Sequence, residues 1–290
     1  YYTWIGTRDI PYDYDDIALP LTDNHMISTV KIGDEWIFLD ATDPNCAFGM
    51  PTKSIQTKQA LLAVDENNFK IIRVPTMKPE QTTLIDSTFI KITDNGIAGN
   101  MSVSYNGYWG NDAYNTLLYK DPKDVREYVK YRMSKASNKF ILGEYSINDK
   151  EKLEKKLNIK ATFEVPAYGK KVGDEIYINL NLEKLFFDSN IDTAKRKVAQ
   201  EKDFKYIIQQ TTILELPQGY KATYVPANAI IDKGDYSFEI KYQQENNKIF
   251  ATQRIINNSL WLDPKDFNTW NSALKDLNAN YKEQVVLQKK

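Results

Sequence analysis

Apolar and polar residues alternate along much of this chain with the two-residue period of a β-strand. The clearest run is residues 236–242, where aromatic and aliphatic side chains alternate with Ser, Glu and Lys. Residues 99–105 alternate in the same way, and an Asp-Asn-Gly turn precedes them at residues 94–96. Such alternation is typical of antiparallel strands that bury one face and expose the other. We therefore expect a protein dominated by antiparallel β-sheets.

Three segments show helical signals instead: residues 122–137, 149–157 and 264–283. Asp121-Pro122 and Asp263-Pro264 each supply a capping residue followed by a first-turn proline. Residues 149–157 are rich in Lys and Glu, with two leucines as anchors. In the last segment apolar residues recur at spacings of three and four, forming one stripe: Phe267, Trp270, Leu274, Leu277 and Tyr281. Such a stripe normally packs into a core, and a partner groove is the alternative.

These elements predict an α+β fold that is mainly antiparallel β. The chain has 290 residues, enough for one large or two ordinary domains. Pro75 and Pro79 mark the expected boundary. The prediction is a smaller β-rich domain at residues 1–78 and a larger one, with the three helices, at residues 79–290.

A hairpin near the N-terminus carries the candidate chemistry. Residues 25–32 and 35–40 read as two strands, and Gly33-Asp34 between them is a hairpin-turn signal. A two-residue turn pairs Ile32 with Glu35, so the residue numbers of any two partners across the hairpin add up to 67. His25, Asp40 and Thr42 then share one face, since side chains alternate along a strand. His25 and Asp40 become diagonal neighbours, roughly 7–8 Å apart at the backbone and within side-chain reach.

A carboxylate next to an imidazole holds the ring in one tautomer and stabilises its protonated form. This is the supporting half of a nucleophilic triad, and His25 is the only histidine of the chain. Asn24 and Thr42 flank the pair and are candidates for supporting hydrogen bonds. The alternative is that His25 and Asp40 form a purely structural or surface hydrogen bond.

The N-terminal region resembles a known family. The resemblance rests on five segments: Thr7-Arg8, Asp16 to Pro20, Asn24 to Ile27, Phe38 to Asp43, and Phe48 to Pro51. Together they resemble the C-terminal half of a transglutaminase-like core, as found in multidomain proteins of Bacteroidetes. The family has a papain-like Cys-His-Asp triad, and His25 and Asp40 match its His and Asp in type, order and spacing. A weaker resemblance to the family's C-terminal domain of unknown function extends over much of the remaining chain, including residues 216–220.

The expected nucleophile is not found at its family position. The family places the cysteine upstream of the histidine, at the start of a helix, whereas the single cysteine here, Cys46, follows both His25 and Asp40. The chain opens at Tyr1 without a methionine, already inside a predicted strand. We therefore expect that the nucleophile helix was lost or belongs to another piece; a degenerate family member is the alternative. Cys46 is expected to be a partly buried thiol in a loop.

Composition excludes several other classes of function. Lys and Arg number 38 against 39 Asp and Glu, so no basic nucleic-acid surface is indicated. No apolar run is long enough for a transmembrane helix, and no signal peptide is visible. One histidine, one cysteine and scattered acids form no zinc set, and the acids of residues 13–16 lack calcium-loop spacing. No cofactor is therefore expected.

Two functions from different classes remain. In the first, the chain is a fragment or degenerate form of a transglutaminase-like thiol acyltransferase or amidase, inactive by itself, acting on a peptide or protein substrate. An upstream domain or neighbouring chain would then cover an apolar surface on the His25/Asp40 face. In the second, it is a non-catalytic β-rich interaction module of a cell-envelope protein. The residues assign no compartment, and the resemblance implies the periplasm or cell envelope.

Overall fold

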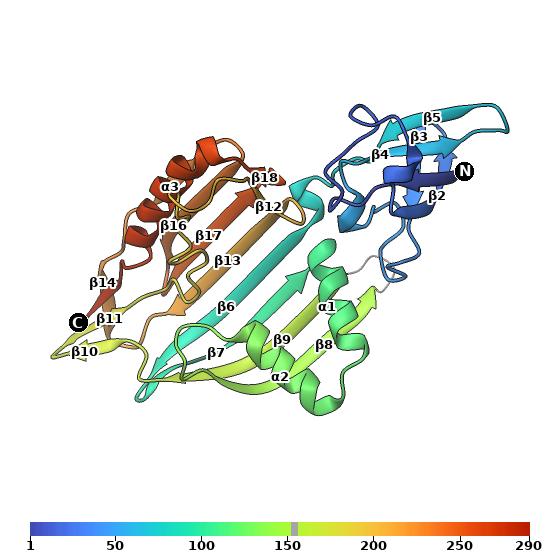
Figure 1. Ribbon diagram of the computed structural model, residues 1–290. Helices are drawn as coiled ribbons and strands as arrows, with labels where there is room; N and C mark the ends of the chain where they lie inside the picture. The colour runs from blue at the N-terminus through green and yellow to red at the C-terminus, as the bar shows by residue number, and fades with distance from the viewer. Residues whose placement is uncertain (152–155) are drawn as a thin grey trace.

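The protein is an α+β structure built mainly from antiparallel sheets (Figure 1). A computed structural model describes residues 1–151 and 156–290. Its largest elements are a five-stranded sheet formed by the N-terminal residues and an eight-stranded sheet formed by the rest of the chain. Figure 1 shows the five-stranded sheet beyond one end of the larger sheet.

The five-stranded sheet has the order β3-β2-β1-β4-β5, and every pair is antiparallel. Its strands are β1 (Tyr2–Ile5), β2 (His25–Ile32), β3 (Glu35–Leu39), β4 (Gln59–Ala63) and β5 (Phe69–Arg73). One face buries a small apolar core because alternate side chains of each strand point to it. Its members are Ile5, Ile27, Phe38, Ala60 and Leu62, and Ile55 and Val74 from the connecting segments close over them.

The eight-stranded sheet has the order β15-β16-β17-β13-β6-β7-β9-β8. Only the β13–β6 pair is parallel. Its strands are β6 (Thr83–Thr93), β7 (Gly96–Tyr105), β8 (Ile141–Glu151), β9 (Lys156–Pro166), β13 (Tyr206–Glu215), β15 (Ala229–Asp232), β16 (Tyr236–Glu245) and β17 (Lys248–Asn257). The alternation at residues 99–105 and 236–242 therefore lies on β7 and β16, as predicted.

Three helices cover one face of the large sheet. Helices α1 (Tyr108–Leu118) and α2 (Pro122–Met133) lie over the β7–β9–β8 side, and α3 (Phe267–Asn280) lies over the β16 side. A four-stranded sheet closes the far end; its strands are β10 (Lys170–Val172), β11 (Glu175–Ile178), β14 (Tyr220–Tyr224) and β19 (Val285–Lys289). A two-stranded ladder and four 3-10 turns complete the described elements: β12 (Gln200–Glu201), β18 (Trp261–Leu262), Pro20–Thr22, Lys53–Ile55, Pro79–Gln81 and Pro264–Asp266.

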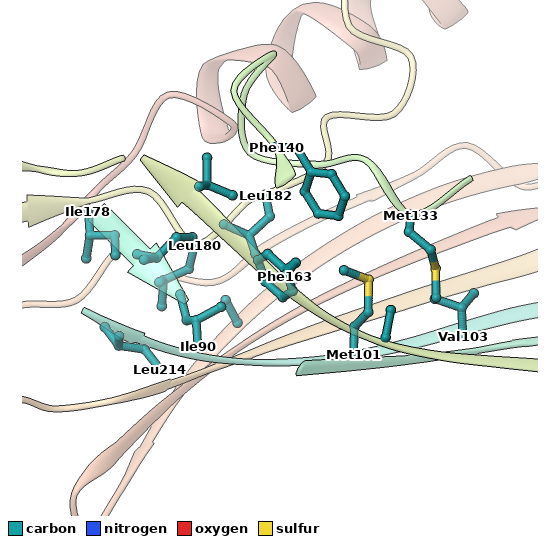
Figure 2. Packing of buried hydrophobic residues seen from close by; sticks show 14 of the residues in the cluster. Ile90, Met101, Val103, Met133, Phe140, Phe163, Ile178, Leu180, Leu182 and Leu214 are labelled. Carbon is teal, nitrogen blue, oxygen red and sulfur yellow. The ribbon is translucent and has the colours of Figure 1, made fainter. Parts of the chain in front are cut away.

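The main core lies between the large sheet, α2 and the segment after β11. Figure 2 shows Met133 of α2 above Met101 and Val103 of β7. Phe140 stacks on Phe163 of β9 with ring centroids 5.4 Å apart. Burial of large apolar side chains is worth about 1.5–3 kcal/mol each before the cost of ordering, so this layer is a major source of stability.

Two of the three predicted helices are confirmed. Asp121 caps α2 by accepting a hydrogen bond from the Asp124 amide at 2.9 Å, and the helix ends at Met133, four residues earlier than predicted. Helix α3 buries the predicted apolar stripe, after a 3-10 turn at its start. None of the described helices combines the length and apolar character needed to cross a membrane.

The predicted helix at residues 149–157 is wrong. Residues up to Glu151 complete β8, β9 begins at Lys156, and the residues between them lie outside the described structure. Ile147 pairs with Ile159, and Glu151 with Lys156. Pairing with β9, whose other edge joins β7, therefore overrides the weak helical preference of the Lys/Glu-rich segment.

Candidate functional site

The predicted hairpin forms in the predicted register. Ile32 pairs with Glu35 and Ser28 with Leu39, so paired positions sum to 67. Gly33 has a φ of 60°, the left-handed conformation that a tight hairpin turn requires and that glycine adopts without a steric cost. Ser28 and Leu39 point away from the small core. Because side chains alternate along each strand, His25 and Asp40 point to the face that carries the small core.

His25 and Asp40 are in direct contact. His25 Nε2 lies 3.0 Å from Asp40 Oδ1, and the two side chains are 17% and 2% exposed. His25 begins β2, where it pairs with Ile5, and Asp40 follows the last residue of β3. Because Nε2 donates to Asp40, Nδ1 is the nitrogen that remains for proton transfer. The pair can therefore act as a base and the carboxylate that orients it.

Asp40 is held by three further hydrogen bonds. Thr42 donates to Oδ1 from its hydroxyl at 2.6 Å and from its backbone amide at 3.1 Å, and the Thr52 hydroxyl donates to Oδ2 at 2.6 Å. Burial raises the pKa of Asp40, but the bonds from Thr42, Thr52 and His25 outweigh it and the net pKa is lowered. Asp40 is therefore favoured as the carboxylate that an imidazolium needs beside it.

We predict that Asp40→Asn lowers the free energy of unfolding at pH 7 by about 1.5–3 kcal/mol, the range for hydrogen bonds to a charged group. A carboxyl whose pKa falls on folding stabilises the fold above its unfolded pKa of about 3.9. That stabilisation is lost as the pH drops through the folded pKa. Urea denaturation at several pH values should therefore show a difference between variant and wild type that disappears in acid.

The matched control for this measurement is Asp34→Asn, in the exposed turn of the same hairpin. It should change stability by less than about 0.5 kcal/mol at every pH. A difference for Asp40→Asn that does not depend on pH would contradict the assigned ionisation of Asp40.

The loop that contains Thr42 and Thr52 is joined to α1 by hydrogen bonds and an ion pair. Asp43 accepts hydrogen bonds from Asn111 at 2.6 Å and Asn115 at 3.2 Å. The Tyr108 hydroxyl donates to the Pro51 carbonyl at 2.5 Å, and Lys53 forms a 2.6 Å ion pair with Asp112. The position of Asp40 therefore depends on a helix whose first residue lies 68 positions later in the sequence.

Sequence reasoning missed both Thr52 and α1. The helical segments predicted from the sequence do not include residues 108–118, where α1 forms. The N-cap of α1 is Gly107, which provides no side-chain capping bond, so the usual start signal is absent. Tyr108 is buried and stacks on Phe204 with centroids 5.1 Å apart.

Asn24 and Cys46 lie in other environments. The Asn24 side chain bonds to Thr7, accepting from its amide and donating to its hydroxyl, each at 2.9 Å. It therefore joins the ends of β1 and β2. Cys46 is half-buried in the loop after β3, as expected, and its thiol donates to the Met50 carbonyl at 3.1 Å.

The expectation of an exposed apolar surface on the His25/Asp40 face is wrong. That face is closed by residues of this chain, since its apolar side chains are buried with Ile55 and Val74. Exposed apolar side chains lie on the opposite face, where Trp4 pairs with both Met26 and Leu61. This open face includes Tyr2, Trp4, Met26, Leu39 and Ile71, which are 37–72% exposed. Alternation explains the result, because these strands carry apolar residues on both faces.

Comparisons with known proteins give limited matches. Residues 174–287, less than half of the chain, match a family described as a domain of unknown function with a solved structure, DUF3858. A crystal structure from Parabacteroides distasonis, described as that of a "putative protease", aligns at 10% identity with a TM-score of 0.49. The alignment covers 99% of this chain and 39% of that chain, so this chain spans less than half of that protein's length. The comparison with curated proteins found no match.

Proposed function

We propose that His25 and Asp40 are the base and the orienting carboxylate of a transglutaminase-like thiol acyltransferase or amidase. The observation that carries this proposal is the 3.0 Å contact between His25 Nε2 and the nearly inaccessible Asp40 carboxylate. The contact fixes which nitrogen is protonated in the neutral ring and leaves Nδ1 as the base. A histidine with a merely structural role does not require a carboxylate held by four hydrogen bonds.

The proposed reaction proceeds through a thioester. His25 Nδ1 takes the proton of a cysteine thiol, and the thiolate sulfur attacks the carbonyl carbon of an amide substrate. The C–N bond then breaks, and the His25 imidazolium gives its proton to the leaving amine. In the second half, Nδ1 takes a proton from water or an acceptor amine as it attacks the thioester carbon. The C–S bond then breaks, and the His25 imidazolium returns its proton to the sulfur, which regenerates the thiol. Asp40 stabilises the imidazolium in both halves and stays ionised.

In this proposal the thiol comes from outside residues 1–290. The Cys46 thiol is engaged with the Met50 carbonyl and packs near Tyr108 and Phe204. The open apolar face of the five-stranded sheet lies opposite His25 and Asp40, so it does not support a segment that brings this thiol to His25, and the closed His25/Asp40 face counts against a missing helix there. The 290-residue chain alone is then expected to lack turnover.

Thiol labelling of this chain tests the proposal directly. We predict that Cys46 reacts with iodoacetamide at the same rate in wild type and His25→Ala, within about twofold, because His25 does not activate it. Asn24→Ala is the matched control, since Asn24 is adjacent in sequence but bonded to Thr7. A tenfold slower reaction of Cys46 in His25→Ala alone would identify Cys46 as the nucleophile and contradict the proposal.

The same probe applies to the full gene product. A cysteine upstream of Tyr1 should label rapidly, and His25→Ala should slow that labelling at least tenfold, whereas Asn24→Ala should not. The absence of an upstream cysteine, or equal labelling in all three proteins, would refute the enzyme assignment. That result would favour the second candidate, a non-catalytic β-rich interaction module, which the open face around Trp4 and Met26 supports.

A further inference from the structure

The face of the large sheet opposite α1, α2 and α3 is covered by none of the described helices (Figure 1). A shallow groove of about 600 Å³ lies on this uncovered face, over β13, β6, β7, β9 and β8. The first four of these strands pair with a neighbour on both sides, so their backbone N–H and C=O groups are used within the sheet. A ligand in the groove must therefore be recognised by side chains.

An apolar strip crosses the floor of the groove. It consists of Phe89 of β6, Ile213 of β13 and Phe250 of β17, which pair in register on three adjacent strands. All three side chains are only half-buried, although the exposed side of an antiparallel sheet is normally polar. At about 4.8 Å between strands, the strip offers a flat apolar surface about 10 Å long.

Hydroxyl and amide side chains lie beside the apolar strip. Ser87 of β6 pairs with Thr211 and Ser102 on the two neighbouring strands, and Asn100 of β7 pairs with Phe89. The side chains of Ser87 and Asn100 are exposed, and no hydrogen bond joins either of them to another described residue. Their donors and acceptors are therefore available to a ligand.

The charged side chains around the groove balance one another. Glu144 and Lys160 line it on the side of β8 and β9. The apolar strip ends at a row of alternating charges that pair in register: Glu245, Lys248, Glu215 and Lys91. The ammonium groups of the two lysines in this row lie 5.8 Å from the ring centroid of Phe89. Because neither sign is in excess, the groove favours a neutral ligand over an anion or a cation.

We propose that this groove binds a neutral carbohydrate chain. A sugar ring has one apolar face of C–H groups and a rim of hydroxyls, which matches an apolar strip bordered by hydroxyl and amide groups. The C–H face is placed on Phe89 and Ile213, and the ring hydroxyls are placed on Ser87 and Asn100. The strip is long enough for linked rings.

Other classes of ligand match the groove less well. An extended peptide that adds to a sheet needs a free strand edge, and the floor strands have none. A nucleic acid needs an excess of basic side chains. The groove shares no lining residue with the His25/Asp40 site, so the proposed thiol chemistry does not depend on it.

Isothermal titration of the 290-residue chain with neutral hexasaccharides tests this proposal. The probes are β-1,4-linked chains of glucose, mannose and xylose and the α-1,4-linked chain of glucose, and at least one should bind saturably. Phe89→Ala should weaken its Kd at least tenfold, because the ring that faces the sugar is lost. Phe69→Ala is the matched control: it truncates a phenylalanine that is 68% exposed on the small sheet, and it should leave the Kd unchanged.

Two further measurements examine the polar part of the site. Asn100→Ala should weaken the Kd by about three- to tenfold, the range for a neutral hydrogen bond, whereas Asn95→Ala, in the exposed turn before β7, should not. Raising NaCl from about 50 to 500 mM should change the wild-type Kd less than twofold, since no ion pair forms.

Binding of none of the four hexasaccharides would overturn the proposal. An unchanged Kd in a folded Phe89→Ala, or an equal loss in Phe69→Ala, would also overturn it. A Kd that rises more than tenfold with salt would show that charge, and not the apolar strip with its hydroxyls, recognises the ligand.

Discussion

Replacing Lys135 with methionine is expected to lower the free energy of unfolding by about 3–5 kcal/mol, because the change leaves Asp86 buried without its cation. The two side chains are 4% and 5% exposed and form an ion pair. Thr88 completes the cluster: it accepts from Lys135 Nζ at 3.0 Å and donates to Asp86 Oδ1 at 2.7 Å. Methionine preserves the length of the side chain, so the loss reports the charge and not a large cavity. Urea denaturation at pH 7 measures the effect.

Two further variants separate charge from packing at this site. Lys139→Met removes the same charge from an exposed position nearby and should change stability by less than about 0.5 kcal/mol. Lys135→Met combined with Asp86→Leu removes both charges and should recover most of the loss, since a buried ion pair contributes little net free energy against apolar residues. A double variant as unstable as the single one would show that packing dominates.

Trp270→Ala is expected to destabilise the protein by about 3–5 kcal/mol, the usual range for truncating a buried aromatic side chain. Trp270 is 4% exposed and lies at the centre of the layer between α3 and β16. Its ring contacts Tyr236, Phe186 and Phe238, with centroids 4.9, 5.6 and 5.8 Å away. Removing it leaves a cavity that these three rings cannot fill without moving. The midpoint of urea denaturation should fall accordingly.

Asn268→Ala provides the comparison on the same helix. Asn268 is exposed, two positions before Trp270 on the solvent side of α3. Its substitution should be nearly neutral. A loss for Trp270→Ala below about 1 kcal/mol would mean that α3 contributes little to the fold, against the burial of its whole apolar stripe.

Local signals predicted the parts of the fold that depend on residues close in sequence. The Gly33-Asp34 turn set the register of the hairpin, and that register was enough to bring His25 and Asp40 to one face. The capping residue and first-turn proline of α2, and the apolar stripe of α3, identified two helices for the same reason. Each of these patterns is complete within about 20 residues.

Long-range contacts decided the rest. Residues up to 151 join β8 because they pair with β9, which in turn pairs with β7. Helix α1 lacks a capping side chain and is held by burial of Tyr108 against Phe204, almost 100 positions away. Thr52 reaches Asp40 only because the loop between them is fastened to α1 by Asn111 and Lys53.

The sequence by itself determined the fold class, the hairpin and the candidate His25–Asp40 pair, because alternation and turn chemistry act between near neighbours. It did not determine which face of the small sheet is covered, since β1, β2 and β4 carry apolar residues on both faces. Nor could it reveal the groove on the uncovered face of the large sheet, whose lining comes from residues 87 to 213. Only the tertiary structure brings those residues together, because packing depends on shape and not on the order of the chain.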